Sequence, residues 1–75
     1  MKRRLEIVED GEQRFWQVHV DDTSVHLRWG VDGGRVSRLT KELPSSGKAN
    51  AEARRLIRQH KNRGYQEVEL DSPSE

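Results

Sequence analysis

Trp29 and Gly30 stand together in the stretch HLRWGVDGGRV, residues 26–36, of a chain with two Trp, one Tyr and one Phe. An indole at a strand end can act as a plate on which a base or sugar stacks. Trp29 also shares its alternating phase with Val25 and Leu27, which favours a packing role in the core or hairpin. The two roles overlap if the indole buries one face and exposes the other.

A strongly basic segment lies in the second half of the chain, although the net charge is only +1. Residues 44–66 contain six basic residues against Glu52 alone, and residues 67–75 contain four acids and no base. Such asymmetry points to a polyanionic partner. At about 100° per residue in a helix, Arg54, Arg58 and Lys61 fall on one strip.

We place this strip opposite the apolar residues Leu56 and Ile57. It is either a solvated face that keeps a small domain soluble or a surface that binds phosphates. Phosphate binding by such a strip would be steeply salt-dependent and largely blind to sequence. The acids at the end of the chain, Glu67 and Glu69, would offset part of the charge if that segment folds back.

Catalytic and metal chemistry find little support in the residue types. The chain has no cysteine, and its three histidines, His19, His26 and His60, are scattered. No order of histidine, acid and nucleophile stands out, and a thin core offers no evident deep pocket. The sequence therefore predicts no catalytic residue, no metal and no cofactor. No apolar run is long enough for a signal peptide or a membrane span, so we expect a cytoplasmic protein.

Alternating residues predict the strands that position these groups. Leu5 and Ile7 alternate with charged neighbours, and residues 15–20 and 24–29 each have one apolar face. In the second run Trp16 lies on the core face, with Phe15 on the other. Asp10-Gly11, Asp21-Asp22 and Gly33-Gly34 mark tight turns between the runs. A fourth run, about 35–43, changes phase between Val36 and Leu39, which indicates a bulge or a late start.

A helical period follows from about residue 46 to 63. Its apolar stripe comprises Ala49, Ala53, Leu56, Ile57 and His60. A serine in Pro44-Ser45-Ser46 can cap its beginning, and Gly64 suits a left-handed end. We expect Tyr65 to fold back onto the core, and Val68 and Leu70 to form a short last strand.

These elements predict an α+β fold, an antiparallel sheet of about four strands with one long C-terminal helix packed across it. We expect one domain over residues 1–70, and a polar tail or linker start over residues 71–75.

The order of these motifs resembles the WGR domain, a module of poly(ADP-ribose) polymerases and of small or fused bacterial proteins. The resemblance covers about residues 2–68. The motifs that carry it are Phe15-Trp16, Trp29-Gly30, Thr40-Lys41-Glu42 and Gly64-Tyr65. Val31 stands where the family has the arginine of its Trp-Gly-Arg motif. The resemblance implies that the domain of the eukaryotic polymerases binds near a DNA break, with the motif Trp and Arg at the DNA end.

Two function hypotheses follow. The first is a non-catalytic module that binds nucleic acid weakly, at a DNA end or a single strand. Its predicted binding residues are Trp29, Gly30, Arg28, Arg35, Arg54, Arg58 and Lys61. The alternative is a protein-interaction module whose sheet edge or Trp29 surface docks a partner chain. The candidate partners are thus DNA or another polyanion, or a protein, and the sequence names neither the partner nor an oligomeric state.

Overall fold

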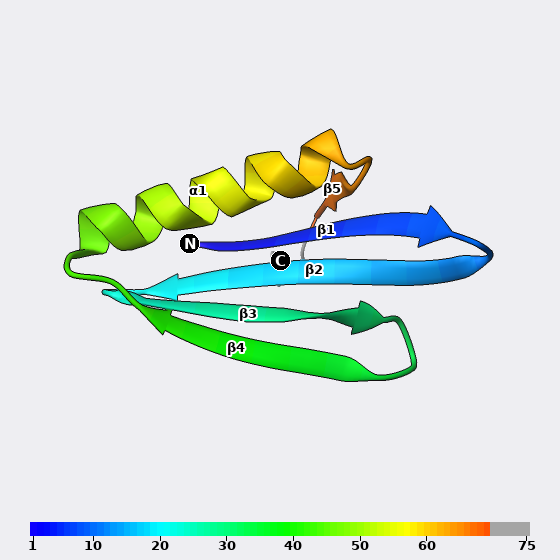
Figure 1. Ribbon diagram of the computed structural model, residues 1–75, viewed down its shortest axis with the longest axis horizontal. Coiled ribbons are helices and arrows are strands. Elements are labelled where there is room, and N and C mark those ends of the chain that lie inside the picture. Colours follow the sequence, from blue (N-terminus) through cyan, green and yellow to red (C-terminus); the bar gives the residue numbers. More distant parts are fainter. Residues whose placement is uncertain (70–75) are drawn as a thin grey trace, which may run out of the picture.

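The computed structural model describes residues 1–69, and the predictions for Leu70 and for the tail lie outside this range. Five strands form one sheet: β1 (Lys2–Glu9), β2 (Glu12–Asp21), β3 (Ser24–Val31), β4 (Val36–Glu42) and β5 (Gln66–Val68). The single helix, α1 (Ser46–Asn62), lies across one face (Figure 1). The expected α+β fold with four main strands is confirmed, and β5 adds a fifth.

The sheet is antiparallel throughout, in the order β4-β3-β2-β1-β5. Short turns join the first four strands. At the first of them Asp10 and Gly11 both have positive φ, at 53° and 77°, as a tight hairpin requires. The second turn is centred on Asp22 and Thr23, one residue later than predicted, because Asp21 still belongs to β2.

The core lies between α1 and the face of the sheet that carries Leu5, Trp16 and Val18. The helical stripe supplies Ala49, Ala53, Leu56 and Ile57, all buried as predicted. The two alanines let the helix approach the sheet closely. Trp16 is a core residue, as expected.

The ends of α1 follow the local sequence. The Ser45 side chain accepts a hydrogen bond from the Lys48 backbone N–H, 3.2 Å away, and so caps the first turn. Gly64 takes a φ of 110° directly after the helix and reverses the chain. Tyr65 then packs against the core, and the following strand β5 pairs with β1.

Two details of the sheet differ from the sequence-based expectations. The pairing of β3 with β4 is continuous from Ser24–Glu42 to Gly30–Val36, so the predicted bulge is wrong. The apolar phase changes because Leu39, opposite Leu27, points to the core side, whereas Val36 points to the other. Phe15 is 4% exposed although it lies on the face that α1 does not cover.

A side chain from β1 covers the ring of Phe15. The Arg4 guanidinium lies over its ring, 4.5 Å from the centroid. Its cross-strand partner is Gly30, which has no side chain. A Cβ on Gly30 would stand 2.1 Å from the Arg35 carbonyl oxygen, so the chain after β3 can return closely only past a glycine.

Candidate functional site

The predicted binding residues do not lie on one surface. Arg54, Arg58 and Lys61 lie on one flank of α1, and Trp29 lies on the other. Arg28 alternates with Leu27 and Trp29 along β3, so it points to the face of the sheet opposite the helix. Arg35 belongs to the exposed β3–β4 connection, where its carbonyl accepts a hydrogen bond from Val31. The fold therefore places on different surfaces the residues that the sequence suggested as one binding site.

The first surface, here called the basic flank, consists of Arg3, Arg54, Arg58 and Lys61. These side chains surround a shallow hollow beside Ile57, between α1 and β1. Ile57 therefore borders the strip, and the predicted placement opposite Ile57 is wrong. Sequence reasoning missed Arg3, because only the packing of α1 over the sheet brings β1 to this side of the helix.

One carboxylate, that of Glu67, forms ion pairs with the basic flank. Glu67 of β5 accepts hydrogen bonds from Arg3 and lies 3.1 Å from Lys61 Nζ. These cations lower the pKa of Glu67 to about 2, mainly through the bonds from Arg3. Within residues 1–69 no ion pair forms at Arg54 or Arg58. The flank therefore keeps an excess of positive charge, with two exposed guanidinium groups open to an anion.

The second surface, the Trp29 groove, lies on the other side of α1. It has a volume of about 290 Å³. It is lined by Trp16, Leu27, Trp29, Leu39, Lys41, Leu56, His60, Arg63 and Tyr65. Trp29 is 37% exposed and stands outside the buried core, so a fully buried core role is wrong, whereas an indole that is partly packed and partly exposed agrees with the overlap of the two predicted roles. Its indole still points to the helix side, opposite Trp16, and presents an accessible aromatic face.

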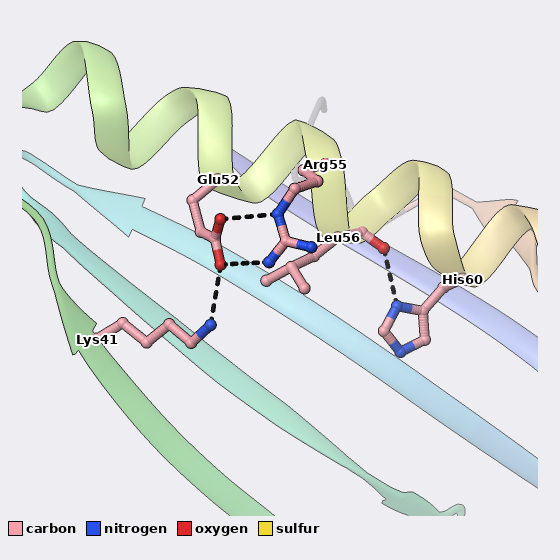
Figure 2. Close-up of polar contacts among 5 residues, drawn as sticks. All are labelled: Lys41, Glu52, Arg55, Leu56 and His60. Atoms are coloured by element: carbon pink, nitrogen blue, oxygen red, sulfur yellow. Dashed lines mark hydrogen bonds and ion pairs between the residues drawn. The ribbon is translucent and has the colours of Figure 1, made fainter.

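The groove stays open because α1 packs on β1, β2 and β3, while β4 extends beyond its cover. Leu39 of β4 is accordingly 47% exposed. Figure 2 shows the polar link across this gap: Lys41 Nζ lies 2.8 Å from Glu52 Oε2, and Glu52 also accepts two hydrogen bonds from Arg55. The bonds from Arg55 and Lys41 lower the pKa of Glu52 to about 2.

Neither a cluster of metal-ligating side chains nor a membrane-spanning helix is present among the described residues. No group of three or more His, Asp or Glu side chains among residues 1–69 could hold a metal ion. The one described helix is neither long nor apolar enough to cross a membrane.

Comparison with known proteins gives two matches. The WGR domain family matches residues 1–72, almost the whole chain. The crystal structure of a Bacteroides fragilis protein, a structural-genomics target, is similar with a TM-score of 0.85 and 30% sequence identity. The similarity covers 92% of this chain and 20% of that one, so this chain spans about a fifth of its structural relative. No curated protein matches the chain.

Proposed function

Because this chain belongs to the WGR domain family, we propose that it is a non-catalytic module that binds nucleic acid weakly through phosphate contacts. The observation that carries the proposal is the basic flank, which gathers Arg3, Arg54, Arg58 and Lys61 around one shallow hollow. Glu67 pairs with Arg3 and Lys61 there. Guanidinium groups without a local partner suit phosphate oxygens, which they can bind through two parallel hydrogen bonds. A cytoplasmic location and a single domain over residues 1–70 remain predictions.

Trp29 makes a separate contact with the nucleic acid in this proposal. Its exposed indole stacks on a terminal base or sugar while the basic flank holds the phosphates. The two surfaces lie on opposite sides of α1, but both reach its C-terminal end, with Lys61 on one and Arg63 on the other. Since a helix with its side chains is about 10–12 Å across, a nucleic-acid end can contact both.

The test is a binding titration of labelled nicked, blunt-ended and single-stranded DNA at two salt concentrations. Changing Arg54, Arg58 and Lys61 to Gln should weaken all three forms alike. It should also flatten the salt dependence of the binding constant by about one unit of slope per lost contact. Arg58→Gln and Lys48→Gln form a matched pair, because both remove one exposed charge from α1 and only Arg58 belongs to the flank.

Equal losses for Arg58→Gln and Lys48→Gln would mean that general charge, not the flank, attracts DNA. Absence of binding by the folded wild type at low salt would overturn the proposal altogether.

The Trp29 groove favours a second candidate function, the docking of a partner protein. Trp29 and Leu39 expose apolar surface next to β4, which is an edge strand with unpaired backbone groups. A peptide could add to this edge and place an apolar side chain in the groove. Salt response separates the two functions, because binding to an apolar groove weakens much less with salt than binding to phosphates does.

A further inference from the structure

The face of the sheet away from α1 carries a third group of cations. Residues that pair across the strands share a face, so two neighbouring rows can be followed from β1 to β4. One row reads Lys2, His19, His26, Thr40. The next row reads Arg4, Gln17, Arg28, Arg38. We call the patch formed by Lys2, His19, His26, Arg28 and Arg38 the open-face patch.

Arg28 and Arg38 are direct cross-strand partners, and both are exposed. Like charges at directly opposed positions destabilise a sheet. No carboxylate within the described residues forms an ion pair with either of them or with Lys2. A bound anion would relieve this repulsion.

The acids near the patch are engaged elsewhere or stand at its margin, where Glu69 lines a shallow hollow together with Lys2. Glu6 accepts hydrogen bonds from Arg4 and Gln13. Glu42 accepts hydrogen bonds from the hydroxyl groups of Thr23 and Ser24, at the beginning of β3. Asp21 pairs with Ser24 in that same last row. The centre of the patch therefore contains cations without an intervening carboxylate.

Two aromatic rings adjoin these cations. The imidazoles of His19 and His26 lie with centroids 5.8 Å apart and planes inclined by 35°. With Lys2, Gln17 and Arg28 they line a shallow hollow of about 190 Å³. His26 Nδ1 lies 3.1 Å from the Thr40 hydroxyl oxygen, which orients its ring. Flat rings beside backbone-binding cations form the combination by which proteins hold unpaired bases.

We infer that the open-face patch is a second nucleic-acid surface, selective for single strands. Arg28, Arg38 and Lys2 contact the phosphates, and the His19–His26 pair supports a base. A duplex exposes base faces only at its ends, so along its length it gains only the phosphate contacts. The patch is separate from the basic flank, which lies on the other side of the sheet. A substitution can therefore abolish binding at one surface and leave binding at the other unchanged.

The experiment measures binding of labelled oligo(dT) and of a hairpin duplex to paired variants. Arg28→Gln/Arg38→Gln and Arg54→Gln/Arg58→Gln each remove two arginines, one pair from each surface. The first pair should weaken oligo(dT) binding more than duplex binding. It should also flatten the salt slope for the single strand by about 1.4, at about 0.7 for each phosphate contact.

A third variant, His19→Ser/His26→Ser, tests the stacking separately. It should weaken oligo(dT) binding about fivefold for each base that no longer stacks on the imidazoles. The salt slope and the duplex binding should stay unchanged. In the Arg54→Gln/Arg58→Gln protein, added oligo(dT) should shift the backbone amide resonances at the centres of β3 and β4.

Two results would overturn the inference. One is oligo(dT) binding by Arg28→Gln/Arg38→Gln with wild-type affinity and slope. The other is an equal loss for single strand and duplex, which would make the patch a general cationic surface. Misfolding does not obscure the outcome, because removing the like-charge pair should leave the melting temperature unchanged or raised, and the amide shifts need no substitution in the patch.

Discussion

The imidazole of His60 stacks on the indole of Trp16, with ring centroids 4.3 Å apart and planes inclined by 22°. The edge of Tyr65 meets the same imidazole at 5.1 Å. His60 Nδ1 donates a hydrogen bond to the Leu56 carbonyl, 2.8 Å away (Figure 2). A titratable ring thus joins the last turns of α1 to β2 and to the segment that follows the helix.

This arrangement makes stability depend on pH. Burial, and to a lesser degree the charge of Arg63, lowers the pKa of His60 from 6.5, while the bond to Leu56 opposes the shift. The folded state therefore favours the neutral ring. As pH falls through the unfolded-state pKa, the unfolded chain takes up the proton first and the free energy of unfolding decreases.

Urea unfolding should consequently show a lower midpoint at pH 5.5 than at pH 7.5. His60→Phe should lose most of this difference, because Phe keeps an aromatic ring on Trp16 and does not titrate. Equal wild-type midpoints at the two pH values would contradict the assignment.

Leu56→Ala should lower the free energy of unfolding by about 2–5 kcal/mol, because Leu56 is a buried member of the core and its loss leaves a cavity. That is a large fraction of the stability expected for a domain of this size. The control is Val8→Ala in β1, whose side chain is 70% exposed and should tolerate truncation. Thermal melts of both variants provide the measurement, and an unchanged Leu56→Ala midpoint would mean that the stripe is not packed as described.

Gly30→Ala should destabilise the fold strongly. Its Cβ would stand 2.1 Å from the Arg35 carbonyl oxygen, and its φ of 152° is strained for any residue with a side chain. Gly47→Ala is the matched control, because a Cβ on Gly47 in α1 would meet only the Ser45 hydroxyl oxygen, at an ordinary contact distance of 3.9 Å. Alanine there should stabilise the helix by up to about 1 kcal/mol. Comparable melting temperatures for the two variants would refute the close approach.

Trp29→Ala should leave the fold intact, since the indole is 37% exposed and does not belong to the buried core. It should weaken binding to DNA ends or single strands selectively if the indole stacks. Circular dichroism checks the fold and anisotropy titrations check the binding. Unfolding of the variant would instead assign Trp29 a structural role, and equal losses for every DNA form would argue against stacking.

Val31→Arg should strengthen binding to DNA ends, because it restores the arginine of the family motif next to Trp29. Val31 pairs with Arg14, so the added charge should cost a few tenths of a kcal/mol in stability. Val8→Arg provides the control, with the same substitution at an exposed position on the opposite face of the sheet. A gain that is equal in the two variants would show that net charge alone is responsible.

The amino-acid sequence by itself determined the elements and the residues that share a face. Alternation in β2 and β3, the stripe through Leu56 and Ile57, and the turn residue Gly11 are local properties, since period and backbone conformation depend on near neighbours. The buried Trp16, the Ser45 cap and the return of Tyr65 follow from the same local rules.

Only the tertiary structure decided which residues become neighbours and which faces are covered. The period of β3 places Trp29 on the core side, but its exposure depends on where α1 ends its cover of the sheet. The position of α1 likewise unites Arg58 with Arg3 and separates Arg28 from both. Glu67 neutralises part of the basic flank only because β5 pairs with β1. Sequence periodicity assigns a residue to a face, whereas the crossing path of the helix and the order of the strands, set by long-range packing, determine what lies opposite that face.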